Sequence, residues 1–372
     1  MNKLTLTLFS LLAPLLFLQT NCKEEITPPI IEQPRDTTSH NFVVTRIDTL
    51  GDLFSSARAV DIVDENNIWV AGEFYEKDTA NNYNLKYNLA HWNGIRWNLI
   101  GIKMQGFGGS ADTSIQPLIT IRVFGDSSII VTSQYSSFAK YNGSKWISFA
   151  PPEGVWKHFW ARTSNDIYFV GDFGSATHYN GQTFTKMTTG LTANALLTDV
   201  WGDDNYTYTL GSSNDMKESA ILYTNKTDIW TIANRYSVDN QTPSPTSMYM
   251  GRMWSIFRAK TKTKLWVIGG EDHGWLYEVT SLSPFSAKIF FVVPDVFYPR
   301  FIRGNVDNDL FLFGELDAKI WHYNAKSWKL FEPAINSFLM QGCSVKTNTI
   351  AIVGESIAGI TGKGIVVTLK HF

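Results

Sequence analysis

The sequence predicts an all-β protein in which four-stranded sheets repeat around a ring, the arrangement of a β-propeller. Three observations predict it. The 372 residues include 13 Trp and 24 Phe, and such an aromatic load favours packed sheets. No long segment after the N-terminus repeats its apolar residues with the 3.6-residue period of a helix. Similar strand patterns recur about every forty residues, which is the spacing of propeller blades.

Residues 156–187 contain the clearest copy of this repeat. Apolar runs end at Trp160 and Val170 with a polar turn between them, and a third run is followed by Asn180-Gly181 and a fourth strand. The Asn-Gly pair between apolar runs is a strong hairpin signal, because both turn positions need positive φ. A single sheet of this size cannot bury its own faces, so copies of it must stack.

Seven copies can be traced by the residue that ends the second strand of each. These anchor residues are Gly72, Ser133, Gly171, Gly211, Gly269, Gly314 and Gly354. Their spacings are 61, 38, 40, 58, 45 and 40 residues, so a period near forty is interrupted by two insertions. The copy around Ser133 is degenerate, and six or eight blades therefore stay open beside the expected seven.

The two ends of the chain are expected to meet in one blade. The last copy has only three strands before the chain reaches Phe372. The run from Phe42 to Asp48 alternates apolar and polar residues and belongs to no other copy. We expect this N-terminal strand to complete blade seven, because joining both ends in one sheet closes the ring and leaves no open seam.

Residues 1–21 look like a lipoprotein signal peptide. Lys3 supplies a positive charge, and the apolar run 4–18 is too short to span a membrane. The run ends just before Cys22 without an Ala-x-Ala site, and a lone cysteine at this place resembles the lipidation site of bacterial lipoproteins. An ordinary secretory signal with a stray cysteine is the alternative. Lys23, Glu24 and Glu25 resemble a signal that sends some lipoproteins to the outer face of the cell.

The domain organisation follows from these features. The signal peptide covers 1–21, a Pro-rich tether covers 22–41, and a single β-propeller covers 42–372. Pro28, Pro29 and Pro34 favour an extended tether between lipid and domain. The expected location is the outer membrane, with the domain exposed at the cell surface or, alternatively, on the periplasmic face.

The repeated pattern Asp-Ile-Trp/Tyr-x-x-Gly followed by His-Tyr-Asn-Gly-x-x-Trp resembles a family of uncharacterised bacterial surface lipoproteins built as β-propellers. The resemblance covers nearly the whole mature chain and implies an architecture, not an activity. Some relatives carry a glucosyltransferase label, but the βαβ units and phosphate cradle of a nucleotide-sugar enzyme are not visible here. An Asp-x-Asp match at 307–309 is expected to be the first hairpin turn of blade six.

The standard catalytic and cofactor motifs are missing from the sequence. There is no Gly-x-Ser-x-Gly, His-Glu-x-x-His, P-loop or Cys-x-x-Cys motif. A formal net charge of −2 gives no basic field for nucleic acid. We therefore expect a monomer with no cofactor, no metal site and no nucleic-acid partner.

Three histidines and one cysteine have structural interpretations. His91, His178 and His322 occupy one repeated position before an aromatic residue, which favours a structural hydrogen-bonding role over metal ligation. Cys343 lies in an inner-strand position and is interpreted as a small buried apolar residue.

Polar residues predict a candidate binding site at one mouth of the ring. An acid follows or lies next to the anchor glycine in five blades, as Glu73, Asp172, Glu271, Glu315 and Glu355. Mostly cationic residues recur near the start of the inner strand, at Arg122, His158, Asp199, Arg252, Arg300 and Gln341. The strand order of a propeller brings both sets to the same face. They either pair internally between blades or form a polar funnel that selects a ligand.

Three long loops are expected on that same face, at 74–88, 101–117 and 233–250. Long loops in compact domains are either functional or disordered. These loops are rich in Tyr and Asn, including Tyr75, Tyr83 and Tyr87, and such residues can stack on sugars or grip a polypeptide. A solvated decoration without function is the alternative.

The sequence thus predicts a non-catalytic, lipid-anchored surface propeller that binds a glycan, a peptide or a partner protein. The alternative is a glycan hydrolase or lyase, which would need two mouth carboxylates about 5–10 Å apart across a cleft. A structural scaffold with no small ligand is a third possibility. The fold alone does not choose among them.

Overall fold

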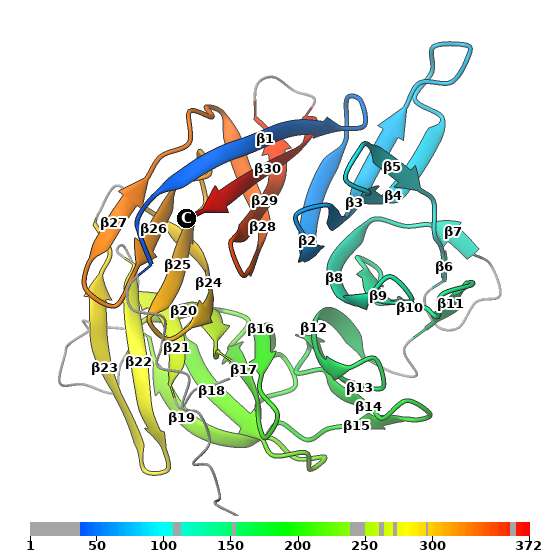
Figure 1. Cartoon of the computed structure of the whole chain (residues 1–372). Coiled ribbons are helices and arrows are strands. Elements are labelled where there is room, and N and C mark those ends of the chain that lie inside the picture. Colours follow the sequence, from blue (N-terminus) through cyan, green and yellow to red (C-terminus); the bar gives the residue numbers. More distant parts are fainter. Residues whose placement is uncertain are drawn as a thin grey trace, which may run out of the picture. The chain divides into compact units, whose positions relative to one another are not determined.

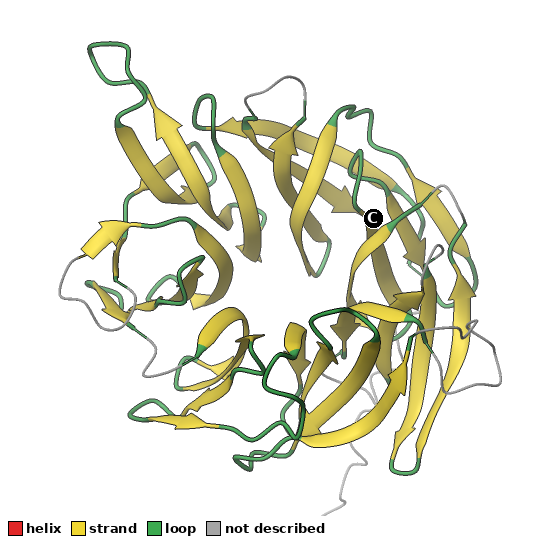
Figure 2. Ribbon diagram, turned by 180° about the vertical axis from the view of Figure 1, so that it is seen from behind, coloured by secondary structure: helices red, strands yellow, loops and turns green. Residues whose placement is uncertain are grey.

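The computed structural model describes residues 38–106, 113–150, 154–238, 250–259, 264–270, 274–294, 297–357 and 362–372. In the compact unit that begins at Asp36, seven four-stranded antiparallel sheets stand around a central axis (Figure 1). The predicted seven-bladed β-propeller is confirmed. Figure 2 shows the same ring from behind, where every described element is a strand or a loop. Within the described part of the chain, no helix has the length and apolar character needed to cross a membrane.

The first three blades follow one another along the chain, directly after β1 (Phe42–Leu50). Blade one contains β2 (Ser56–Asp64), β3 (Asn67–Glu76), β4 (Leu85–Trp92) and β5 (Trp97–Ile100). Blade two contains β8 (Leu118–Gly125), β9 (Ser128–Ser133), β10 (Phe138–Tyr141) and β11 (Trp146–Phe149). Blade three contains β12 (Val155–Thr163), β13 (Asp166–Asp172), β14 (Ala176–Tyr179) and β15 (Phe184–Lys186).

The remaining blades follow in the same order. Blade four contains β16 (Leu196–Gly202), β17 (Thr207–Ser212), β18 (Glu218–Thr224) and β19 (Thr231–Ser237). Blade five contains β20 (Arg252–Phe257), β21 (Leu265–Gly270), β22 (Trp275–Leu282) and β23 (Phe285–Val292). Blade six contains β24 (Pro299–Val306), β25 (Asp309–Gly314), β26 (Ile320–Tyr323) and β27 (Trp328–Phe331). Residues 307–308 connect β24 to β25, which confirms the predicted hairpin turn.

Blade seven joins the two ends of the chain, as predicted. It contains β28 (Phe338–Lys346), β29 (Thr349–Ser356), β30 (Gly364–His371) and, outermost, β1 (Phe42–Leu50). β1 pairs antiparallel with β30 along its whole length, and Figure 1 shows the two strands side by side. Backbone hydrogen bonds between the two ends therefore close the ring.

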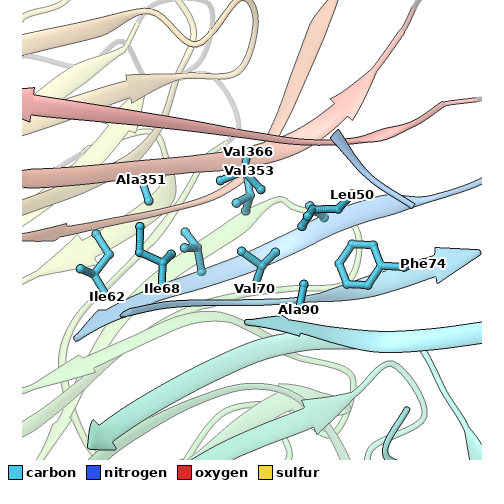
Figure 3. Packing of buried hydrophobic residues seen from close by; sticks show 11 residues of the cluster. Leu50, Ile62, Ile68, Val70, Phe74, Ala90, Ala351, Val353 and Val366 are labelled. Atoms are coloured by element: carbon cyan, nitrogen blue, oxygen red, sulfur yellow. The ribbon is translucent and has the colours of Figure 1, made fainter. Parts of the chain in front are cut away.

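The core lies between neighbouring blades. Figure 3 shows the contact of blades one and seven, where Ile68 and Val70 of β3 face Val353 of β29 and Val366 of β30. All four side chains are fully buried. Because alternate strand residues point to opposite faces, each blade packs one apolar face against each neighbour, and this stacking stabilises sheets that could not stand alone.

The three repeated histidines make the hydrogen bonds that the sequence predicts. His91 Nε2 lies 3.0 Å from Asn67 Oδ1, His178 Nε2 lies 2.8 Å from Asp166 Oδ1, and His322 Nε2 lies 3.0 Å from Asp309 Oδ1. In each blade the partner is the first residue of the second strand. Each ring also stacks on an aromatic residue of that strand, at centroid distances of 3.8, 4.5 and 4.7 Å.

The insertion between blades one and two is a packed hairpin. Its strands are β6 (Lys103–Gln105) and β7 (Thr113–Ile115). Ile102 and Met104 are buried in the core between the two blades. Asn88 Nδ2 donates hydrogen bonds to the carbonyl oxygens of Ile102 and Gln116, which ties both ends of the insertion to β4. The described part of 101–117 thus stabilises the fold.

Candidate functional site

The inner strand of every blade carries a β-bulge at the same place. In blade one the register with the second strand shifts at Arg58, and in blade three it shifts at Lys157. The other five blades show the same shift, at Ile119, Thr198, Trp254, Arg300 and Gln341. A bulge inserts one residue that has no partner across the ladder, and it re-aims that residue's side chain.

The repeated glycine of the sequence pattern pairs next to this bulge. A Cβ added to Gly171 would lie 2.0 Å from the Val155 carbonyl oxygen. On Gly354 it would lie 2.0 Å from the Leu339 carbonyl oxygen, and on Gly72 it would lie 2.2 Å from that of Ser56. The bulged strand brings its backbone so close that no side chain fits at these three positions. Only blade two differs among the seven, with Ser133 at the equivalent place.

All seven bulge residues line one central cavity with a volume of about 1530 Å³. We call this set the bulge ring, and its members in blade order are Arg58, Ile119, Lys157, Thr198, Trp254, Arg300 and Gln341. None of the seven is buried. Each lies within the first four residues of its inner strand, so the ring surrounds the cavity near one mouth. It contains three cations and one large aromatic residue, and no carboxylate.

The three cations of the bulge ring face acids that lie in, or directly after, the second strand of their own blade. Arg58 Nη2 lies 3.7 Å from Glu73 Oε2, and Lys157 Nζ lies 3.7 Å from Asp172 Oδ2. Arg300 Nη1 lies 3.7 Å from Glu315 Oε1. These three pairs lie within a blade, whereas the sequence left open a pairing between blades, and only Arg300–Glu315 joins two residues that the sequence singled out. Long ion pairs at partly exposed positions contribute only about 0–1 kcal/mol each.

Glu73 is held more firmly than the other acids. Lys86 Nζ lies 2.7 Å from its carboxylate, and the Tyr75 hydroxyl donates a hydrogen bond of 2.6 Å to the same oxygen. Burial opposes ionisation of Glu73, but the hydrogen bonds from Lys86 and Tyr75 outweigh it and lower the pKa of the carboxyl. The Tyr75 hydroxyl and the Glu73 carboxylate are thus hydrogen-bonded to each other.

The predicted site residues divide into two groups. Those that line the central cavity are Arg122, His158, Asp172, Asp199, Arg252, Arg300 and Glu355. Those that lie outside the lining are Glu73, Tyr75, Tyr83, Tyr87 and Glu315. Glu271 lies outside the described residues, as does the predicted lipidation site Cys22.

The sequence alignment of the inner strands missed the bulge. Of the residues that it named, Arg300 and Gln341 lie at a bulge, whereas His158 and Asp199 each lie one residue after it. Arg122 lies three residues after the bulge of blade two, and Arg252 lies two residues before that of blade five. Arg58, Lys157 and Trp254 were not predicted as site residues, although they belong to the bulge ring. One signal could have found them, because a repeated glycine within a strand pattern indicates a bulge or a close approach of backbones.

Asp199 and Asp61 connect neighbouring blades. Asp199 Oδ2 accepts hydrogen bonds from the backbone N–H of Ile256 and from the Ser255 hydroxyl in blade five, at 3.0 and 2.9 Å. Asp61 Oδ2 accepts a hydrogen bond of 2.7 Å from the backbone N–H of Val123 in blade two. Inner-strand N–H groups that point toward the preceding blade need such acceptors. These carboxylates therefore have structural partners.

Two further cavity residues have shifted pKa values. Burial lowers the pKa of His158, although Asp199 and Asp172 oppose the effect, so its imidazole is neutral at pH 7. Burial raises the pKa of the Cys343 thiol to about 12. Cys343 is half-buried and lines the cavity, whereas the sequence predicts a small buried apolar residue there.

The cavity is more basic than the chain as a whole. Its described lining contains nine Lys and Arg residues and six Asp and Glu residues, whereas the whole chain has a formal net charge of −2. A cleft lined by an excess of one charge concentrates ligands of the opposite charge. The cavity is therefore suited to anionic groups.

The long 74–88 loop does not cover the cavity. β3 and β4 continue into it as an extended hairpin, and Figures 1 and 2 show this hairpin projecting beyond the outer edge of the ring. Tyr83 makes local contacts there, with its ring centroid 5.5 Å from that of Phe54 and 5.2 Å from Lys77 Nζ. In the third predicted loop, residues 239–249 lie outside the described residues.

One group of side chains resembles a metal site in composition. Ligand atoms of Asp309, His322 and His371 lie within 4.8 Å of one another, and all three side chains are buried. Hydrogen bonds account for the arrangement, because His322 Nε2 lies 3.0 Å from Asp309 Oδ1 and His371 Nε2 lies 2.6 Å from the Ser39 carbonyl oxygen. The group joins blades six and seven.

Comparison with known proteins places the chain among propellers. No family model and no curated protein matches it. A catalytically inactive virginiamycin B lyase from Staphylococcus aureus with quinupristin superposes with a TM-score of 0.63 and 10% identity, over 89% of this chain and 100% of that one. YCF48 bound to D1 peptide superposes with a TM-score of 0.56 and 11% identity, over 90% and 98%. YCF48 from Cyanidioschyzon merolae superposes with a TM-score of 0.54 and 11% identity, over 87% of this chain and 98% of that one. The likeness is one of fold alone.

Proposed function

We propose that this protein is a lipid-anchored propeller at the bacterial cell surface that binds a ligand, without catalysis, at the mouth surrounded by the bulge ring. The ligand is a glycan, a peptide or a partner protein. The observation that carries the proposal is the recurrence of one backbone irregularity in seven blades, which aims seven side chains into a single cavity. The protein acts as a monomer attached to the outer membrane through Cys22.

The choice of side chains in the bulge ring supports binding over a purely structural role. Closing the ring needs the strands and the apolar faces of the blades, but it does not need cations that point into the cavity. The side chain of Lys157 is 33% exposed and that of Arg300 is 53% exposed. Rigid strands hold these groups in place before any ligand arrives, which lowers the entropic cost of binding.

The comparisons lend general support to a binding role. Two of the similar structures contain a second molecule, quinupristin in one and D1 peptide in the other. At 10–11% identity neither ligand carries over to this chain.

The enzyme alternative receives less support from the cavity. A glycan hydrolase or lyase needs two carboxylates free to exchange protons with a substrate. Among the described acids of the cavity, Asp61 and Asp199 accept hydrogen bonds from neighbouring blades, and Asp203 Oδ2 lies 2.5 Å from Arg258 Nε. Three of the six described cavity acids thus have structural partners, which leaves Asp172, Asp204 and Glu355 as the carboxylates that an enzyme of this kind would have to use.

Array binding tests the proposal directly. The full-length chain, purified in a mild detergent, is incubated on glycan and peptide arrays beside a triple variant with Arg58→Gln, Lys157→Gln and Arg300→Gln. Arg96→Gln is the matched control, because Arg96 is exposed in the β4–β5 turn on the opposite face. We expect the wild type and the control to share one binding profile that the triple variant loses. An unchanged profile in the triple variant would place the site elsewhere.

A further inference from the structure

Four contiguous members of the bulge ring form an arc with complementary chemistry. They are Thr198, Trp254, Arg300 and Gln341, contributed by blades four to seven in order. In order around the ring they offer a hydroxyl, the accessible part of an indole, a guanidinium and an amide. The Trp254 side chain is half-buried, because it also packs against the core between blades five and six. Figure 1 shows their strands β16, β20, β24 and β28 as consecutive inner strands around the axis.

One cation precedes the aromatic residue of this arc on the same strand, and a second is contributed by the next blade. Arg252 precedes Trp254 by two residues on β20, is exposed and lines the same cavity. It forms no ion pair with any other described residue. Arg300 follows on the next blade. An indole that lines a cavity together with guanidinium groups can pack against an apolar surface of a ligand while the guanidinium groups bind its anions.

Arg300 is available to a ligand. Its distance of 3.7 Å to Glu315 is long for an ion pair, and the two side chains are 53% and 42% exposed. A pair of this kind contributes little, because water and salt screen it. A ligand carboxylate that makes two parallel hydrogen bonds to the guanidinium can replace Glu315 at small cost.

The arc matches an acidic sugar better than an acidic peptide. The ring of a sugar presents a flat C–H face, which packs on an indole plane, and hydroxyl groups, which hydrogen-bond to Thr198 and Gln341. A carboxylate on the same ring reaches Arg300 or Arg252. An acidic peptide supplies carboxylates, but its carboxylate side chains offer no flat apolar face for Trp254.

We infer that the ligand of the mouth is an acidic glycan, a sugar chain that bears carboxylates, held by Trp254, Arg252 and Arg300. The inference rests on the proposed function and names the ligand class of the same site. The other cations of the bulge ring, Arg58 and Lys157, lie on blades one and three and extend the basic surface across the cavity. They suit a chain of several acidic residues rather than a single sugar.

Calorimetric titration of the full-length protein in detergent tests the inference. The probes are uronic-acid hexasaccharides from pectin and alginate, the methyl ester of the pectin fragment, and hexaglutamate. The variants are Arg300→Gln, Arg252→Gln, Trp254→Leu and the conservative Trp254→Tyr, with Arg96→Gln as the control. Thermal melting of each variant confirms that it is folded.

We expect a uronic-acid hexasaccharide to bind the wild type and Arg96→Gln equally. The methyl ester should bind at least about tenfold more weakly, and Arg300→Gln should weaken the acid form by about 10- to 100-fold, because a charged hydrogen bond is lost. Trp254→Leu should weaken binding to a similar extent, and Trp254→Tyr should recover most of it.

Three results would overturn the inference, and they separate it from the proposed function. If the methyl ester binds as well as the acid, charge is not recognised. If hexaglutamate binds as tightly and Trp254→Leu has no effect, the site takes an acidic peptide, and the mouth remains a binding site. If no uronic-acid probe binds while the arrays detect another ligand, the ligand class is wrong. If neither the arrays nor the calorimetric titrations detect any binding, the proposed function is rejected as well.

Discussion

His40 Nδ1 lies 3.0 Å from His322 Nδ1, and this contact joins the segment before β1 to the third strand of blade six. His322 Nε2 lies 3.0 Å from the Asp309 carboxylate and donates a hydrogen bond to it. In a neutral His322, Nδ1 therefore accepts a hydrogen bond from the Nδ1–H group of His40. His40 Nε2 then accepts a hydrogen bond of 2.9 Å from the Ser327 hydroxyl. The chain of hydrogen bonds is complete when both imidazoles are neutral.

The same segment differs from its prediction. The sequence places residues 38–41 at the end of a tether, whereas Thr38 and His40 already contact blade six. Asn324 Nδ2 donates a hydrogen bond of 2.9 Å to the Thr38 carbonyl oxygen. Phe42 packs against His322 and Phe331, with centroid distances of 5.1 and 5.2 Å. The folded domain therefore includes these residues.

The first prediction concerns pH. The pKa of His40 is lowered from 6.5 to about 4, first by burial and then by His322, Lys329 and His371. Burial also lowers the pKa of His322, against the opposing effect of Asp309. The unfolded chain therefore protonates these histidines at a higher pH than the folded chain does. The contribution of the two neutral imidazoles to the free energy of unfolding is complete above about pH 6.5 and is lost as the pH falls toward about 4.

Thermal melting between about pH 7 and about pH 4.5 checks this prediction. The melting temperature of the wild type should fall more steeply than that of His40→Gln, in which one titrating group is missing. Arg96→Gln should keep the slope of the wild type. Parallel curves for the wild type and His40→Gln would show that other groups account for the acid sensitivity.

The second prediction concerns ring closure. Arg46 Cζ lies 3.4 Å from the centroid of the Trp92 ring, and Asp48 accepts hydrogen bonds from Arg46 and Trp97 at 2.7 and 2.9 Å. These contacts fasten β1 to blade one. Arg46→Met should lower the free energy of unfolding by about 1–3 kcal/mol, measured by denaturant titration.

The matched control for Arg46 is Lys370→Gln on the adjacent strand. Its ion pair with Glu65 is exposed, so the change should cost less than about 1 kcal/mol. Deleting residues 42–48 should destabilise far more and promote association, because it exposes the edge of β30. Equal stability of the Arg46 and Lys370 variants would mean that the cation adds nothing to closure.

The third prediction concerns the bulge glycines. Gly171→Ala places a Cβ against the backbone of Val155, so the bulge must shift, at a cost of about 2–4 kcal/mol. In Gly211→Ala the nearest atom is the end of the Leu191 side chain at 2.8 Å, which can move aside. The free energy of unfolding, measured by denaturant titration, should therefore be clearly lower for Gly171→Ala than for Gly211→Ala. The reverse order would contradict the steric explanation of the repeat.

The fourth prediction concerns the anchor. Cys22→Ser should remove the lipid attachment site, and the protein should leave the detergent phase on phase separation of membrane extracts. Replacing Lys23, Glu24 and Glu25 with Ala should keep the protein in that phase but reduce its cleavage by protease added to intact cells. Unchanged partitioning of Cys22→Ser would refute the lipid anchor.

Local features of the sequence determined the architecture. Strand periodicity, turn residues such as Asn180-Gly181 and the spacing of the anchor glycines predict hairpins and a blade count that the structure confirms. The repeated histidines were also predictable, because their partners lie 12 to 24 residues away in the same blade. All of these depend on contacts within about forty residues, where pattern and turn chemistry decide pairing.

Only the tertiary structure decided which side chains enter the cavity. A one-residue shift in strand pairing exchanges the two faces of a strand, so the bulges moved Arg58, Lys157 and Trp254 into the cavity lining. Likewise, the partners of Asp199 and Asp61 come from the next blade, 57 and 62 residues along the chain. Such contacts depend on how blades stack in space, and no periodicity within a single blade encodes that.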